Sequence, residues 1–203
     1  FTDWLPFYWN DYAQTTRYTY ILTKLNDLEC VWSNMSQHTR RNIKKAKEQF
    51  QIIVKKGIPV DDFLRVQAQT FERQKIKNIR STNVLQKLIQ VCRQRGQGVL
   101  WGGYDQEGNL NAAVFVVLKK KVAYYLAGGG NPQLRGSGAH SLVLWEAIRE
   151  MADYSESFDF EGSMLPGVER FFREFGGVPT PYSAINKGKL SLIDRAFIKF
   201  NSK

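Results

Sequence analysis

The sequence predicts an α/β (mixed α+β) fold, in which helices flank a central, mostly antiparallel sheet with one βαβ crossover. Three apolar segments with strand periodicity follow one another between residues 99 and 127, which is typical of an antiparallel meander. After residue 127, helix and strand patterns alternate, which predicts a helix that crosses over between two parallel strands. Of the 203 residues, 43% are hydrophobic, enough for a real core, and no apolar run approaches the ~20 residues of a membrane span.

The first half of the chain reads as strands and helices in turn. Ser36 is a suitable N-cap, and Ile43, Ala46 and Phe50 after it share one helical face. Ser81 is a second candidate cap, with Leu88 among the residues turned inward. The expected elements are a strand at 14–22, a helix at about 36–50, a strand at 51–54, and helices at about 61–74 and 81–96.

The second half begins with the meander and continues through the crossover. Gly176-Gly177 marks the end of its last helix, because glycine is favoured just past a helix C-terminus. The expected elements are strands at 99–104, 110–118 and 122–127, a glycine-rich loop at 128–138, a helix at 139–154, a strand at 157–161, a helix at 166–175, a strand at 182–185 and an amphipathic tail to Lys203.

The net charge of +10 is concentrated in one segment. Residues 37–98 hold fifteen Lys or Arg and four acids. The densest part, on the helix expected at 36–50, contains Arg40, Arg41, Lys44 and Lys45. Such a surface suits a phosphate-rich partner, for which tRNA, a nucleotide cofactor or an anionic membrane surface are the candidates. The alternative is an ordinary solvated basic face.

The chemistry of cysteine and histidine excludes other classes of protein. Cys30 and Cys92 are too few for a disulfide scaffold or a structural zinc site, and we expect reduced thiols and a cytoplasmic location. His38 and His140 have no partners at ligand spacing, so no metal is expected.

A glycine-rich turn precedes the helix at 139–154. In this position, backbone amides and a helix N-terminus can receive an anion, and an arginine adds a charge-assisted contact. The turn lacks the Gly-Lys-Ser/Thr of a Walker A loop, and the alternative is a plain strand-to-helix connection. The residues expected to bind a cofactor phosphate are Gln133, Leu134, Arg135, Gly136, Ser137, Gly138 and Ala139.

The order of the elements and this turn resemble the GNAT acyltransferase superfamily. Within it, the chain is similar to the FemAB-like branch of peptidoglycan-bridge aminoacyl transferases and their acetyltransferase-like relatives. Residues 35–46, 158–163 and 170–177 carry this resemblance, which covers roughly 14–186. Because FemAB-like chains contain two GNAT-like halves, the resemblance implies the tail of a preceding half at 1–25, a basic linker helix and strand at 26–58, and the acyltransferase domain at 59–203.

The resemblance also implies an activity. An acyl or aminoacyl group would pass from acyl-CoA, such as acetyl-CoA, or from aminoacyl-tRNA to an amine acceptor, with cell-envelope biosynthesis as one setting. The turn would then hold the pyrophosphate of CoA.

One position departs from the family pattern. Many GNAT enzymes have a catalytic Tyr, and bridge-forming FemAB members a Lys, where this chain has Phe172. Phenylalanine transfers no proton, so we expect Glu161 as the base, Asp159 on the same strand face beside it, and Tyr182 as a donor. A surface carboxylate and a packed tyrosine are the structural alternatives. The functional alternative is a catalytically degenerate GNAT-like module that binds RNA or another anionic partner.

Overall fold

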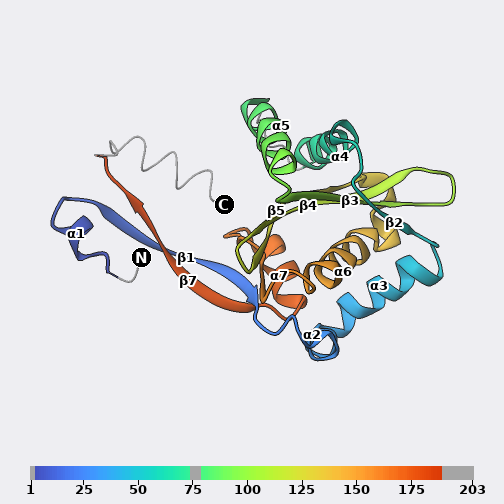
Figure 1. The fold of residues 1–203 in the computed structure, drawn as a ribbon, viewed down its shortest axis with the longest axis horizontal. Coiled ribbons are helices and arrows are strands. Elements are labelled where there is room, and N and C mark those ends of the chain that lie inside the picture. Colours follow the sequence, from blue (N-terminus) through green and yellow to red (C-terminus); the bar gives the residue numbers. More distant parts are fainter. Residues whose placement is uncertain (1–2, 74–78, 189–203) are drawn as a thin grey trace. The chain divides into compact units, whose positions relative to one another are not determined.

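The structure, a computed structural model, describes residues 3–73 and 79–188 (Figure 1). It divides into a larger unit, Thr19–Thr180, and a smaller one that combines Phe1–Tyr18 with Pro181–Lys203. The tail expected to reach Lys203 lies outside the described residues. No helix among the described residues is long and apolar enough to cross a membrane.

One sheet runs through the described chain, with the strand order β2-β3-β4-β5-β6-β1-β7. Its strands are β1 (Ala13–Leu22), β2 (Ile53–Lys56), β3 (Gly98–Tyr104), β4 (Leu110–Lys119), β5 (Val122–Gly130), β6 (Ser157–Asp159) and β7 (Val178–Asn186). The β2/β3, β3/β4, β4/β5 and β1/β6 pairs are antiparallel, whereas β5 and β6 are parallel. The link between β5 and β6 is the 3-10 helix η1 (Pro132–Ser137) followed by α6 (Ala139–Met151). This confirms the mixed sheet with a βαβ crossover.

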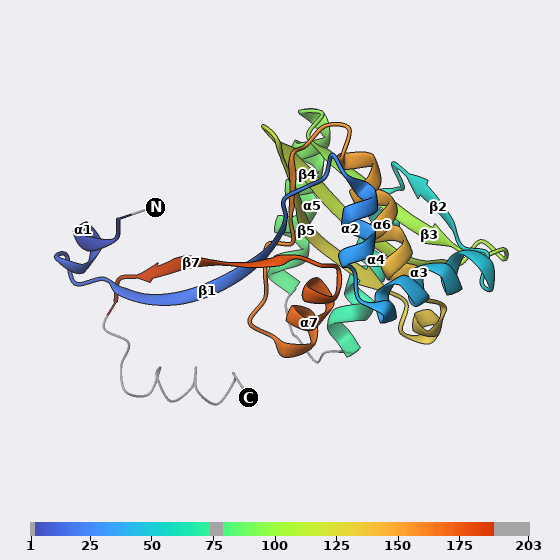
Figure 2. The same ribbon diagram turned by 90° about the horizontal axis from the view of Figure 1, so that it is seen from below.

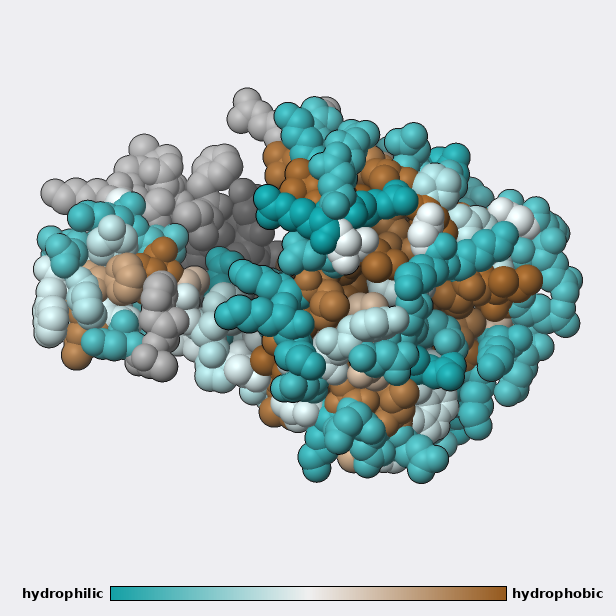
Figure 3. Space-filling view, in the orientation of Figure 1, coloured by the Kyte–Doolittle hydropathy of each residue, from teal (hydrophilic) through white to brown (hydrophobic). Residues whose placement is uncertain are grey.

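Helices cover both faces of this sheet (Figures 1 and 2). On one face, α4 (Val60–Arg73) and α5 (Ile79–Gln94) bury Phe63 and Ile89 against Phe115 of β4. On the other, α6 contributes Leu144 and Ile148 to a larger core. The helices α2 (Leu28–Asn34), α3 (Gln37–Glu48) and α7 (Pro166–Glu174) join that core. Hydrophilic side chains dominate the surface of the larger unit in Figure 3, with small hydrophobic patches between them.

The predicted basic helix is confirmed as α3, because the Ser36 hydroxyl accepts a hydrogen bond from the Thr39 amide at 3.1 Å. Two helices were missed. The helix α1 (Leu5–Tyr8) is one turn long, and α2 buries only Val31, so neither has a clear apolar period.

Several boundaries differ from the prediction. The strand expected at 51–54 is β2, two residues later, and Gly128–Gly130, expected in a loop, extend β5. The helix expected to 154 ends at Met151, the strand expected to 161 ends at Asp159, and β7 begins at Val178. Ser81 is no cap, since α5 begins at Ile79, and Leu88 is 41% exposed rather than inward.

The smaller unit contains α1 and the outer parts of β1 and β7. The Gln14 side-chain amide donates to the Ser183 hydroxyl at 2.7 Å, and the Lys187 ammonium lies 4.9 Å from the ring centre of Tyr12. That residues 1–25 are the tail of a preceding half stays a prediction, as do the boundaries expected at 26–58 and 59–203.

Candidate functional site

The parallel strands β5 and β6 pair only briefly, and the candidate residue Asp159 lies in the last pair. The paired positions are Val122–Ser157, Ala123–Phe158 and Tyr124–Asp159. Beyond Asp159, β6 ends, whereas β5 continues to Gly130.

A β-bulge directs the side chains of β5 at this point. Val116 pairs with Tyr125 and Phe115 with Ala127, which leaves Leu126 as the extra residue. Tyr125 therefore packs into the core beneath α6, whereas Leu126 and Ala127 both pack against the core beneath α4 and α5.

The glycine-rich turn leads directly into the N-terminus of α6. Gly138, at φ 76°, separates η1 from α6, and the Ser137 hydroxyl accepts a hydrogen bond from the Ala139 amide at 3.3 Å. Arg135 is exposed, and nothing lies within 4 Å of a Cβ placed on Gly136. The turn thus presents an open backbone position and a cation at a helix N-terminus, which favours an anion.

The start of the turn is fixed by Asn131. Its side-chain oxygen accepts a hydrogen bond from the Gln133 amide at 3.0 Å, and its carbonyl accepts one from the Leu134 amide at 3.1 Å. The Leu134 carbonyl in turn accepts from the Ser137 hydroxyl at 2.8 Å. Gln133 and Leu134 therefore shape the turn through their backbones.

The four predicted basic residues of α3 are in different environments. Arg40 donates to the carbonyls of Ser33 at 2.9 Å and Trp32 at 3.4 Å, at the C-terminal end of α2. The Lys45 ammonium lies 5.3 Å from the ring centre of Phe50. Arg41 and Lys44 are exposed. The side of α3 that carries Asn42 packs against Gly138, which places the basic helix next to the turn.

Asp159 and Glu161 lie together at the end of β6. The Asp159 carboxylate accepts hydrogen bonds from the Glu161 amide at 2.8 Å and from the Thr19 hydroxyl. Glu161 has φ 60°, a strained conformation for a residue with a side chain, and this contact stabilises it. Partial burial and the charge of Asp159 raise the pKa of Glu161, which moves it toward the range of a useful base.

Sequence reasoning missed Tyr124, which pairs with Asp159 across the strands. Burial and then the charges of Asp159 and Glu161 raise the pKa of Tyr124. A tyrosine in an alternating strand carries no signal of this kind, because its partner Asp159 belongs to another strand and comes 35 positions later. Tyr182 belongs to the smaller unit and is 45% exposed, so its role stays a prediction.

Phe172 is a core residue. It is 3% exposed, its ring stacks on Phe160 with centres 5.1 Å apart, and it forms a T-shaped pair with the ring of Tyr125, with centres 5.8 Å apart. The side chain at this position is therefore fully used in packing.

A hydrogen bond of 3.2 Å joins the Tyr125 hydroxyl to Nε2 of His140 in α6. Sequence reasoning considered His140 only as a metal ligand and did not consider Tyr125 at all. The two residues are 15 positions apart and on different elements, so no local pattern predicts the contact.

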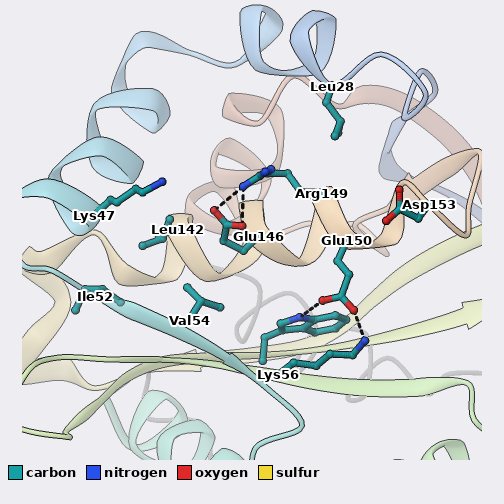
Figure 4. A pocket seen from close by; sticks show the side chains of 11 residues that line it. Leu28, Lys47, Ile52, Val54, Lys56, Leu142, Glu146, Arg149, Glu150 and Asp153 are labelled. Carbon is teal, nitrogen blue, oxygen red and sulfur yellow. Dashed lines mark hydrogen bonds and ion pairs between the residues drawn. The ribbon is translucent and has the colours of Figure 1, made fainter.

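A cavity of about 570 Å³ lies between α6, β2 and Trp101 of β3, away from the turn (Figure 4). Its charged groups neutralise one another: Glu150 accepts from the Trp101 indole at 3.2 Å and pairs with Lys56, and Glu146 pairs with Arg149 at 2.9 Å. None of the predicted site residues lines it.

A family model described as "Acetyltransferase (GNAT) domain" matches residues 33–173. No curated protein matches the sequence significantly. Among solved structures, FemX is similar with a TM-score of 0.72 and 13% identity over 95% of this chain. L-PGS from Bacillus licheniformis is similar with a TM-score of 0.63 and 12% identity over 99% of this chain.

The C-terminal domain of a protein described as a lysylphosphatidylglycerol synthetase, from Agrobacterium fabrum, is also similar, with a TM-score of 0.64 and 11% identity over 95% of this chain. The match covers 65% of the FemX chain, 69% of the L-PGS chain and 68% of the Agrobacterium chain. At these identities the likeness establishes the fold alone.

Proposed function

Because the chain belongs to the GNAT acetyltransferase family, we propose that it is an N-acyltransferase that moves an acyl or aminoacyl group from a phosphate-bearing carrier to an amine. One observation carries this proposal. The exposed Arg135 and the open backbone of Gly136 lie at the N-terminus of α6, beside the point where β5 and β6 stop pairing. A carrier phosphate bound there would hold its acyl group near the end of β6.

Each site residue then has a role. Within the turn from Gln133 to Ala139, the exposed Arg135 and the open backbone at Gly136 meet the phosphate, while Gln133 and Leu134 fix the shape of the turn. Glu161 removes the proton of the acceptor amine, and Asp159 holds the Glu161 backbone and attracts a cationic amine. The role of Tyr182 as a donor stays a prediction, because this residue belongs to the smaller unit.

The carrier is acetyl-CoA or another acyl-CoA in one form of this proposal and aminoacyl-tRNA in the other. Arg41 and Lys44, exposed on the helix next to the turn, support the second form, because a polynucleotide extends beyond one pyrophosphate. Reversing both charges should weaken retention of alanyl-tRNA and flatten its salt dependence. Arg40 is left intact, since it contacts the end of α2. A wild-type protein that retains tRNA equally at 50 and 200 mM salt would contradict this form.

We place the reaction in the cytoplasm, with cell-envelope biosynthesis as its setting. The free thiols Cys30 and Cys92 support a reducing compartment. The similarity in fold to FemX and to lysylphosphatidylglycerol synthetases supports an envelope-directed acceptor.

The experiment is a turnover assay with acetyl-CoA or alanyl-tRNA and a mixture of amine acceptors, read by mass spectrometry. The wild type should give an acylated amine with one donor. Gly136→Asp, which places a negative charge in the open position, should lose this activity, whereas the matched control Gly136→Ala should keep it. Equal rates in Gly136→Asp and wild type would contradict the role of the turn.

The second candidate is a degenerate GNAT-like module that binds RNA or another anionic partner. The burial of Phe172 favours it, because the position of the familiar catalytic side chain is committed to the core. Turnover with either donor excludes this candidate. Retention of tRNA without turnover supports it.

A further inference from the structure

A hydrogen-bonded pair, formed by the core residue Tyr125 and the half-buried His140, lies where β5 and β6 stop pairing. Tyr125 is the first residue of β5 beyond the last pair with β6, and it is 8% exposed. Its hydroxyl lies 3.2 Å from Nε2 of His140, the second residue of α6. The pair thus connects the helix N-terminus beside the turn with the interior of the site.

The backbone of β5 makes room for this pair. A Cβ on Gly128 would lie 2.1 Å from the Tyr125 hydroxyl oxygen and 3.1 Å from Nε2 of His140. Any other residue at 128 would displace both polar groups. The glycine and the bulge at Leu126 together hold the phenol under α6.

The surroundings fix the protonation of both groups. Burial raises the pKa of Tyr125, so its hydroxyl keeps its proton at neutral pH. Burial and the nearby charge of Arg135 lower the pKa of His140 to about 4, so the imidazole is neutral. We assign the Nε2–H tautomer to His140; in this tautomer the imidazole donates to the phenol oxygen and leaves the phenol proton for a third group.

The rings around the pair leave that proton without another acceptor in the described part of the protein. Phe172 forms a T-shaped pair with Tyr125, with ring centres 5.8 Å apart, and Phe171 forms one with His140, with ring centres 5.3 Å apart. Both neighbours are apolar, and His140 is the only hydrogen-bond partner of the phenol among the described residues.

We propose that Tyr125 is the proton donor to the departing carrier atom, and that His140 is its positioning residue. This inference rests on the proposed acyl transfer. The acceptor nitrogen forms a bond to the carbonyl carbon, and the bond from that carbon to the carrier sulfur or oxygen breaks. The departing atom keeps the electron pair and takes the phenol proton, Glu161 takes the proton lost by the amine, and water returns both residues to their starting states. Acyl transfer then needs no proton donor at position 172, because Tyr125 of β5 supplies the proton.

The test compares two donors that differ in their leaving group, acetyl-CoA and S-phenyl thioacetate, with the same amine acceptors. The aryl thiolate departs readily without a proton. Tyr125→Phe should lower the rate with acetyl-CoA by about 100-fold and the rate with the aryl thioester by about 10-fold or less. Tyr20→Phe is the matched control, because Tyr20 is a buried tyrosine whose hydroxyl donates to Glu169 instead. It should keep both rates.

Histidine is tested in the same assay. His140→Phe should show the same dependence on the leaving group, and His140→Gln, which retains a side-chain N–H donor, should recover part of the rate. An equal loss with both donors in Tyr125→Phe, or no loss, would overturn the inference while the proposed function stands. No turnover by the wild type with acetyl-CoA, alanyl-tRNA or the aryl thioester would overturn both.

Discussion

The backbone carbonyl of Asn42 lies directly against Gly138, so that a Cβ on Gly138 would meet the carbonyl oxygen at 2.5 Å. This contact joins the basic helix α3 to the turn before α6. It also explains why two glycines of the same turn have different roles. Position 138 requires glycine, because its φ of 76° is strained for other residues and the Asn42 backbone leaves no room for a Cβ. The space around Gly136 is open.

Gly138→Ala should destabilise the protein by about 1–3 kcal/mol, because the new side chain is strained at positive φ and meets a backbone carbonyl. Gly136→Ala is the control and should leave the free energy of unfolding almost unchanged. Urea unfolding of the three proteins measures this. Equal stability of Gly138→Ala and wild type would show that α3 does not hold the turn.

Arg40→Ala should lower the free energy of unfolding by about 1 kcal/mol, since it removes the hydrogen bond that Arg40 donates to the Ser33 carbonyl and the weaker one to the Trp32 carbonyl. Arg41→Ala, one position along α3, removes an exposed side chain and should have little effect. If instead both variants unfold like the wild type, Arg40 is an ordinary surface cation.

The pKa of His140 makes stability depend on pH. With a pKa of about 4 in the folded state and 6.5 as its ordinary value, the unfolded state binds the proton first as pH falls. Stability should therefore decrease between pH 6.5 and 4, by at most about 3 kcal/mol from this group. In His140→Asn this part of the decrease should vanish. An identical pH dependence of unfolding in the two proteins would contradict the burial of a neutral imidazole.

Asp159→Asn should lower the pKa of Glu161, because it removes the neighbouring negative charge that helps to raise it. The amide oxygen of Asn can still accept the Glu161 N–H. If Glu161 is the base, the acidic limb of the pH–rate profile should move to lower pH. A profile that keeps its acidic limb would assign that limb to another group.

Phe172→Ala should cost about 3–5 kcal/mol, since it empties a site between Phe160 and Tyr125 in the core. Val178→Ala, exposed just beyond the same helix, is a suitable control. A small loss of stability in Phe172→Ala would mean that the side chain is free to act on a ligand.

Much of the fold follows from periodicity along the chain. The meander of β3, β4 and β5 and the crossover through α6 have long, regular apolar patterns, and the Ser36 cap is a local signal. The one-turn helix α1, the short helix α2 and the strand character of Gly128–Gly130 are decided by packing that local propensity does not contain. In particular, Gly129 lies against the backbone of Val66 and Gln67 in α4, so the sheet extends where glycines suggest a loop.

The site was less accessible to sequence reasoning. Asp159 and Glu161 were expected on one face of a strand, but β6 ends at Asp159, and the Glu161 amide instead donates a hydrogen bond to the Asp159 carboxylate. The sequence does not predict that Arg40 contacts the end of α2 while Arg41 and Lys44 are exposed, because this depends on where α2 ends. The Tyr125–His140 pair depends on a bulge, a glycine and a helix start, which come together only in the folded chain.

The most direct measurement is the melting temperature of the wild type, Gly136→Ala and Gly136→Asp with saturating acetyl-CoA, free CoA or bulk tRNA. A carrier that binds the native state raises the melting temperature by mass action. We predict a rise with at least one of these carriers in wild type and Gly136→Ala, and none in Gly136→Asp. No rise in the wild type, or the same rise in all three proteins, would contradict a phosphate-bearing carrier at this turn.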